Sequence, residues 1–266
     1  MAKSHKVDKP YRVLPVFVTA HPPIIPFFSR RIGLDDAGVP QPVAYGAKVT
    51  GQLGRFDVGV VQVRTRESGR APAENFGVVR VQRRFWRQSS VGGILTTRDA
   101  ASTTSRQTAG VDAVLSTAQF LGRQVLEVSG FYVATTKRPG TSGGAAYGGR
   151  INLPNDPINA RLSIREVQDG YDPAVGFVDR RGYRLVNPAV RYTVHTNRSR
   201  ITRRFSIEGD FSYYFDLTGQ LESRKGDIQV FRTELQTSDI AEFHVLPLYE
   251  RLPRPFQIAP GVTLPA

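Results

Sequence analysis

Hydrophobic and polar residues alternate with a period of two over much of the chain. In residues 43–53 one side of the alternation carries Tyr45, Ala47, Val49, Gly51 and Leu53, and the other carries Gly46, Lys48, Thr50 and Gln52. Gly54-Arg55 forms a tight turn, and a second extended run begins directly after it. Because successive side chains of a β-strand point to opposite faces, this region is predicted to be a β-hairpin.

The same pattern predicts an all-β protein with about twelve antiparallel strands. Helical periodicity is nearly absent, and its best candidate, Ser238–Arg251, is interrupted by Pro247. Alternation is clean in 145–153, 158–165 and 201–216, whereas 56–66 and 75–86 can be phased either way, as β-bulges would produce. The expected strands are 43–53, 56–66, 75–86, 91–98, 109–119, 125–137, 144–153, 158–167, 182–195, 201–216, 219–233 and 240–249.

The two faces of these strands differ more sharply than in an ordinary half-buried sheet. One face carries charged and amide side chains together, and the other carries aliphatic, small and aromatic residues. Many strands are close to the ~9–11 residues that a tilted strand needs to cross a bilayer. We therefore predict that the apolar face meets lipid and that the polar face lines a lumen. The candidate lumen-facing or ligand-contacting residues are Arg150, Asn152, Arg161, Arg165, Glu208 and Asp210.

The connections between the expected strands alternate in length. Short ones fall at Gly54-Arg55, Arg87–Ser90, Phe120–Gln124, Pro154–Pro157 and Thr196–Arg200, and longer ones at Glu67–Glu74, Asp99–Thr108, Arg138–Gly143 and Gln168–Arg181. Short turns at one end and long loops at the other are typical of outer-membrane barrels, whereas a Greek-key sandwich has no reason to keep this parity. The predicted fold is therefore an antiparallel up-and-down transmembrane β-barrel. The hairpin of 201–216 and 219–233 breaks the parity and is expected to project beyond the membrane.

Composition narrows the classes of partner. The formal net charge of +13 indicates an anionic neighbour, either nucleic acid or a phosphate-rich lipid surface. Arginine is spread through the whole chain, which weakens the nucleic-acid interpretation. The absence of cysteine excludes disulfides, thiol catalysis and thiolate metal sites. The N-terminal residues have a basic start but no apolar run, so they do not form a secretory signal. We expect residues 1–23 to be poorly ordered and 24–266 to form the barrel domain.

Several blocks of the chain carry a family resemblance. In order, they are "PFFSRRIG" (Pro26–Gly33), "YGAKVTGQLGRFDVGVVQVRT" (Tyr45–Thr65), "ENFGVVRVQRRF" (Glu74–Phe85), "VGGILTTRD" (Val91–Asp99), "YDPAVGFVDRRGYR" (Tyr171–Arg184) and "YERLPRPFQIAPGVTLP" (Tyr249–Pro265). They resemble a family of bacterial outer-membrane β-barrel domains of unknown function, which in full-length members follow a family-9-like carbohydrate-binding domain. The resemblance implies location in the outer membrane, lipid as a partner and carbohydrate as a ligand. It also implies an incomplete barrel, because relatives carry a signal peptide and binding domain before these blocks and further strands after them.

Candidate chemistry is sparse. His5, His21, His195 and His244 have no partner at metal-ligand spacing, so we predict no metal site and no cofactor. Asp169, Asp172, Asp179 and Arg180 lie on the longest expected loop, next to Glu166. Such carboxylates suit glycoside hydrolysis or calcium binding. The interpretation we favour is that Asp172-Pro173 and Gly176 form turns and that Asp179 pairs with Arg180 or Arg181.

Two further motifs have competing interpretations. "GGAAYGG" (Gly143–Gly149) lies inside an alternating strand and precedes no helix, so it fails the context of a phosphate loop. The basic runs "RRFWR" (Arg83–Arg87) and "RSRITRR" (Arg198–Arg204) could contact phosphates and stack on bases. In a barrel they would instead lie at strand ends, with Phe85 and Trp86 in an interfacial girdle. We favour the barrel.

Three functions remain open at this point. The first is a non-enzymatic outer-membrane β-barrel segment linked to carbohydrate binding or handling at the cell surface. The second is a soluble basic all-β module that binds nucleic acid or an anionic polysaccharide. The third and weakest is a glycoside hydrolase that uses the loop carboxylates. The sequence does not indicate an oligomeric state.

Overall fold

A computed structural model gives the structure of the chain and describes residues 24–35, 38–69, 71–100, 103–136, 143–196, 199–252, 255–259 and 261–264. Within these residues the protein is all-β, and the only helical element is the 3₁₀ turn η1 (Ser29–Arg31). No helix among them is long and apolar enough to cross a membrane. The strands are β1 (Ile24–Ile25), β2 (Val43–Leu53), β3 (Phe56–Thr65), β4 (Glu74–Phe85), β5 (Ser89–Ala100), β6 (Thr103–Phe120), β7 (Gln124–Thr135), β8 (Ala145–Pro154), β9 (Ile158–Val167), β10 (Phe177–Val178), β11 (Tyr183–His195), β12 (Thr202–Phe215), β13 (Leu221–Leu235), β14 (Ile240–Val245), β15 (Leu248–Glu250), β16 (Phe256–Ala259) and β17 (Val262–Leu264).

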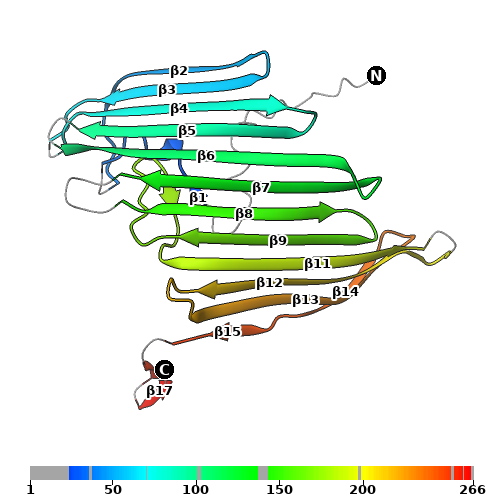
Figure 1. The fold of residues 1–266 in the computed structure, drawn as a ribbon. Helices are drawn as coiled ribbons and strands as arrows, with labels where there is room; N and C mark the ends of the chain where they lie inside the picture. Colours follow the sequence, from blue (N-terminus) through cyan, green and yellow to red (C-terminus); the bar gives the residue numbers. More distant parts are fainter. Residues whose placement is uncertain are drawn as a thin grey trace. The chain divides into compact units, whose positions relative to one another are not determined.

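The strands form an antiparallel up-and-down sheet in which sequence neighbours pair with each other (Figure 1). Among the described residues this sheet has 13 strands, in the order β14-β13-β12-β11-β9-β8-β7-β6-β5-β4-β3-β2, with β15 also paired to β13. The internal contacts divide the chain into two compact units. Unit 1 covers residues 1–113, 133–143 and 172–179, and unit 2 covers 114–132, 144–171 and 180–266, so that β6 and β7 contribute to both.

Unit 1 buries its hydrophobic core on one face of β3, β4 and β5. Phe76 is fully buried and packs with Ala174 and Val175, which the loop before β10 supplies. Phe27, Ile32 and Val63 pack against this cluster, and the backbone N–H of Phe28 donates to the carbonyl of Val175 at 2.7 Å. The segments around β1 and β10 therefore cover the end of this face that carries Phe76.

Unit 2 has a smaller core at the end of its sheet nearest the loop 168–182. Ala146, Val167 and Tyr183 pair directly across β8, β9 and β11, and all three are buried. A Cβ on Gly144 would lie 2.2 Å from the carbonyl carbon of Gly170, so only glycine permits this close approach of two backbones. The remaining length of the sheet in unit 2 has one polar face and one apolar face.

All twelve expected strands are present, with ends shifted by a few residues. The expected loop Asp99–Thr108 is wrong, because β5 continues to Ala100 and β6 begins at Thr103. The Thr residues of this stretch suggested a loop, but they are β-branched and favour strands. Residues 137–142, which form most of the expected loop Arg138–Gly143, and residues 1–23 lie outside the described part of the chain.

The helical candidate Ser238–Arg251 is not formed, and of the irregularities suggested for β3 and β4 only a register shift between β2 and β3, at Val43/Tyr45, is present. Ser238–Arg251 contains the strands β14 and β15, which Leu246-Pro247 separates. The pairing of β3 with β4 has no register shift. Their phase was ambiguous because valines occupy both faces: Val61 and Val78 lie on the face that carries the core, and Val60 and Val79 lie on the opposite, exposed face.

Candidate functional site

The polar face of unit 2 carries all six residues that the alternation singled out. Arg150 pairs with Ser163 and Asn152 with Arg161 across β8 and β9, and these positions share a face. The register continues through Ala189 of β11 to Asp210 of β12, and through Arg191 to Glu208. Arg150, Asn152, Arg161, Arg165, Glu208 and Asp210 therefore lie on this one face, which we call the polar face. Whether it lines a lumen stays a prediction.

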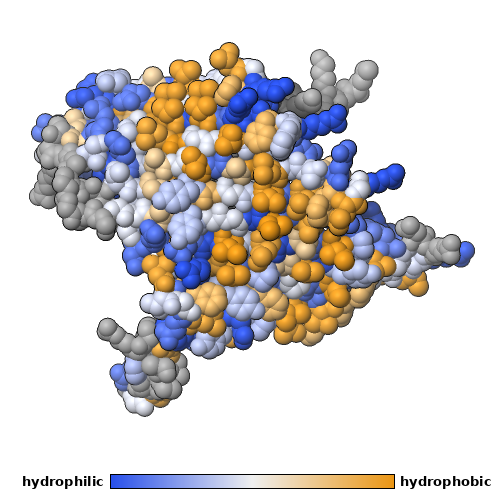
Figure 2. Space-filling model, in the orientation of Figure 1, coloured by the Kyte–Doolittle hydropathy of each residue, from blue (hydrophilic) through white to orange (hydrophobic). Residues whose placement is uncertain are grey.

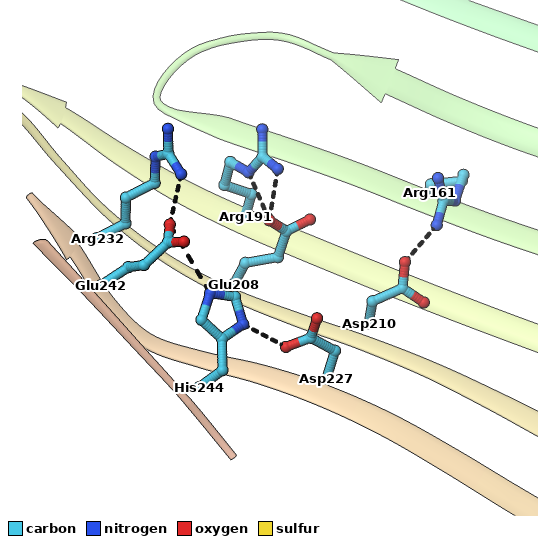
Figure 3. Close-up of polar contacts among 8 residues, drawn as sticks. All are labelled: Arg161, Arg191, Glu208, Asp210, Asp227, Arg232, Glu242 and His244. Atoms are coloured by element: carbon cyan, nitrogen blue, oxygen red, sulfur yellow. Dashed lines mark hydrogen bonds and ion pairs between the residues drawn. The ribbon is translucent and has the colours of Figure 1, made fainter. Parts of the chain in front are cut away.

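Ion pairs run across the polar face from strand to strand (Figure 3). Arg161 of β9 donates from Nη2 to Oδ2 of Asp210 on β12 at 2.6 Å, and Asn187 of β11 donates to the other oxygen of this carboxylate at 2.7 Å. Arg191 donates from Nε to Glu208 Oε2 at 2.8 Å. The side chains of Arg161, Asp210 and Arg191 are about a third to a half exposed. The face thus presents fixed charges that remain accessible to solutes.

His244 of β14 extends this network. Its Nδ1 lies 2.6 Å from Asp227 Oδ1 and its Nε2 lies 3.9 Å from Glu242 Oε2. Glu242 also accepts a hydrogen bond from Arg232 at 2.5 Å (Figure 3). His244 therefore belongs to an ion-pair network, a role that its isolated position in the sequence did not suggest.

The opposite face of unit 2, here the apolar face, is exposed. Its residues come from β8, β9, β11, β12, β13 and β14, and they have exposed fractions of 37–54%. They are Tyr147, Ile151, Ile158, Leu162, Ile164, Val190, Tyr192, Val194, Phe205, Ile207, Val230, Phe231, Phe243 and Val245. Figure 2 shows hydrophobic side chains gathered over the strands on the face that it displays.

Unit 1 also exposes hydrophobic residues on one face of its sheet and carries polar residues on the other. Val49, Val60, Val79, Val91 and Leu95 are exposed on one side of β2 to β5. On the other side, Arg80 and Asp112 form a bidentate ion pair in which the two side chains are only 3% and 0% exposed. Arg98 pairs with Glu74 at 3.0 Å and is also buried. Both units therefore expose aliphatic residues on one face, and unit 1 also buries charged residues on the other.

Asp172 on the loop and Glu166 at the end of β9 are held by separate partners. Asp172 accepts a hydrogen bond from Arg106 at 2.5 Å, and Glu166 accepts one from the Tyr147 hydroxyl and one from Arg184, both at 2.7 Å. Asp169 lies against Gly182, whose φ is +69°. Arg180 pairs with Glu222, and the expected pairing of Asp179 with Arg180 or Arg181 stays a prediction.

In the described part of the chain, these residues do not form a recognisable nucleophilic or metal-binding centre. In the described ranges no group of three His, Cys, Asp or Glu side chains is placed to hold a metal ion. His195 Nε2 lies 3.1 Å from Asp156, and His5 and His21 lie outside the described residues. The glycines of "GGAAYGG" serve the packing of strands: a Cβ on Gly148 would lie 2.5 Å from the carbonyl oxygen of Ile164. Trp86 is 80% exposed in the turn after β4 and contacts Phe85.

Sequence reasoning missed several residues of the polar face, above all Arg191, Gln229 and Arg232. Strict alternation from Gln229 would place Phe231, not Arg232, on this face. In the structure Gln229 pairs with Glu208 and Arg232 pairs with Ser206, so three residues of β13 span two of β12. This bulge directs Arg232 to the polar face. The position of Arg191 on the polar face could have been predicted from the sequence, because Val190, Tyr192 and Val194 alternate with Arg191, Thr193 and His195.

Comparison with known proteins leaves the identity of the chain open. No family model, curated protein or solved structure matches it. The resemblance to the outer-membrane barrel family therefore stays a prediction from the sequence blocks.

Proposed function

We propose that this chain forms the wall of a transmembrane β-barrel in a bacterial outer membrane and has no enzymatic activity. In this proposal the apolar faces contact lipid and the polar faces contact water. The polar side chains would bind or guide a solute that enters from outside. The resemblance to domains that follow a carbohydrate-binding domain makes a carbohydrate the expected class of solute.

The observation that carries the proposal is the inverted exposure of the two faces. Burying a Val, Leu, Ile or Phe side chain is worth about 1.5–3 kcal/mol, so an exposed apolar face over six neighbouring strands is very unfavourable in water. A patch this wide indicates lipid or a partner surface. In unit 1, Arg80, Asp112 and Gln82 are buried on the face opposite the exposed valines. This arrangement matches a barrel with lipid outside and polar residues inside.

The strands also have suitable lengths. The strands β8 and β9 have 10 residues each, and β11, β12 and β13 have 13, 14 and 15. A tilted strand needs ~9–11 residues to cross a bilayer. In lipid every backbone N–H and C=O needs a partner, so the proposal requires that the edges at β2 and β14 be closed by pairing with further strands.

The proposed activity is passive. The ion pairs of Arg161 with Asp210 and Arg191 with Glu208 hold polar side chains in fixed positions, and their remaining N–H and oxygen groups can bond the hydroxyls of a solute. The proposal assigns binding or guidance to the face and no bond-breaking step.

Lipid insertion can be tested with the native chain, because Trp86 is its only tryptophan. The chain is refolded from urea into lipid vesicles and floated on a density gradient after a carbonate wash. We expect it to float with the lipid. Trp86 lies at a strand end, so we expect bromine near the headgroups to quench its fluorescence more than bromine at the chain ends.

The opposite outcome is equally clear. A monodisperse monomer in low-salt buffer without detergent, which fails to float, would refute the membrane proposal. Binding of duplex DNA with a steep salt dependence would then favour the soluble basic module.

A further inference from the structure

The polar face of unit 2 contains a pocket of about 360 Å³ near the turn before β9. This volume lies within the range of pockets that hold small ligands. The lining is almost wholly polar and comes from β9, β11, β12, β13 and the turn before β9. The residues that matter for recognition are Asn159, Arg191, Arg204, Gln229, Arg232 and Asp156.

Gln229 is the first sign that the pocket accepts a ligand. Its side chain lines the pocket, the residue is only 6% exposed, and its Nε2 has no hydrogen-bond partner among the described residues. Leaving a buried amide donor without a partner costs about 1–3 kcal/mol. A ligand atom that accepts this N–H removes the cost. A ligand that satisfies this donor would place an acceptor oxygen at the buried end of the pocket.

Three arginines supply the second sign. Arg191, Arg204 and Arg232 each bond a carboxylate that does not line the pocket: Glu208, Glu234 and Glu242. A guanidinium has five N–H groups, so each arginine keeps donors beyond its ion pair. The three side chains are a third to a half exposed and can be reached by solute.

The lining favours a ligand with acceptor oxygens, because the three arginines and Gln229 all supply N–H donors. The carboxylates of Glu208, Glu234 and Glu242 offset the charges of the arginines, and the lining carboxylate, Asp156, is 65% exposed and lies 3.1 Å from His195. The bulge in β13 directs Arg232 into this set of donors, since strict alternation would have placed Phe231 there. Bulges often re-aim a side chain at a functional position.

We propose that this pocket binds the oxyanion group of a small solute, with Arg191, Arg204 and Arg232 at its mouth and Gln229 at its buried end. The inference rests on the proposed function, because it requires that the polar face be wet. It adds the chemical class of the ligand: a phosphate or a sugar carboxylate. Asn159 and Asp156 would bond neighbouring hydroxyls.

The test is isothermal titration of the chain in a neutral detergent, with inorganic phosphate, glucuronate and glucose as separate probes. We expect saturable one-to-one binding of glucuronate or phosphate, weakened by added salt, and no binding of glucose. Binding of both anions indicates recognition of the oxyanion alone. Binding of glucuronate without phosphate identifies a sugar acid as the ligand.

Variants localise the site. Arg232→Gln and Gln229→Glu should each weaken binding roughly tenfold or more, because one removes a charged donor and the other adds a repelling carboxylate. The matched control is Arg64→Gln, which removes the same charge from an exposed arginine of β3 that bonds Asn75 and lies outside the pocket, and it should leave affinity unchanged. Equal loss in the control would overturn the assignment to this pocket.

The wild-type titration decides the question even if a variant fails to fold. Absence of saturable binding of both anions would overturn the inference. Flotation with lipid alongside that result would leave the membrane proposal intact, whereas binding without flotation would refute the membrane proposal and keep the pocket.

Discussion

The polar faces of the two units carry the same residue types but differ in how far water reaches them. In unit 1, the segments around β1 and β10 cover one end of the face, and the pair of Arg80 with Asp112 is buried. In unit 2, the pair of Arg161 with Asp210 is about a third exposed, and a pocket opens on the same face. Burial, more than residue type, therefore separates ion pairs that hold the fold from ion pairs that can meet a solute.

Asp112→Ala should have the largest effect on stability. It leaves the buried Arg80 without its bidentate carboxylate, and removing one partner of a buried pair costs about 3–5 kcal/mol. The measurement is the free energy of unfolding in urea, from detergent or vesicles, followed by circular dichroism. A loss below ~1 kcal/mol would contradict the distinction between the two units, since Arg80 would then behave as an exposed residue.

Leu162→Arg should have the second largest effect on stability. Leu162 is 40% exposed on the apolar face, and an arginine on the lipid side of a barrel costs about 2–4 kcal/mol near the midplane. Its neighbour Arg161 lies on the other face, so Arg161→Leu is the matched control. It should cost only ~0.2–1 kcal/mol, because it breaks one partly exposed pair. Equal losses of vesicle insertion in both variants would mean that the faces are assigned wrongly.

Asp210→Ala measures how much a partly exposed ion pair of unit 2 contributes to stability. The substitution breaks the pair with Arg161 and the hydrogen bond from Asn187 on a partly exposed surface. We expect a loss of ~0.2–1 kcal/mol that shrinks as salt is added. The free energy of unfolding at low and high salt gives both values. A loss as large as that of Asp112→Ala would show that burial does not govern these pairs.

The regular part of this fold could be predicted from sequence, because its strands alternate. Once the face of one residue is known, the faces of all other residues in that strand follow. Arg161 and Leu162 show this: neighbours in sequence, they lie on opposite faces as the period of two requires. The same rule failed where the chain departs from the period. The bulge that turns Arg232 and the two-residue strands β1 and β10 leave no periodic signal, and the ion pair of Arg80 with Asp112 joins residues 32 positions apart. The pocket therefore lay beyond sequence reasoning.

The smallest effect should come from Asp216, in the partly exposed turn between β12 and β13. The Thr218 hydroxyl donates to its carboxylate at 2.6 Å and the backbone N–H of Gln220 donates at 2.8 Å, and these bonds lower the pKa of Asp216, the Thr218 bond most. Because the pKa is lowered on folding, the stabilisation is complete above the unfolded value of about 3.9 and is lost as pH falls through the folded pKa. Thr218→Val should raise the pKa of Asp216 towards its ordinary value, measured by carbon NMR of the side chain. The variant should be less stable than the native chain at neutral pH and equal to it in acid. A stability difference that does not change with pH would show that Thr218 acts through packing of the turn and not through the Asp216 carboxylate.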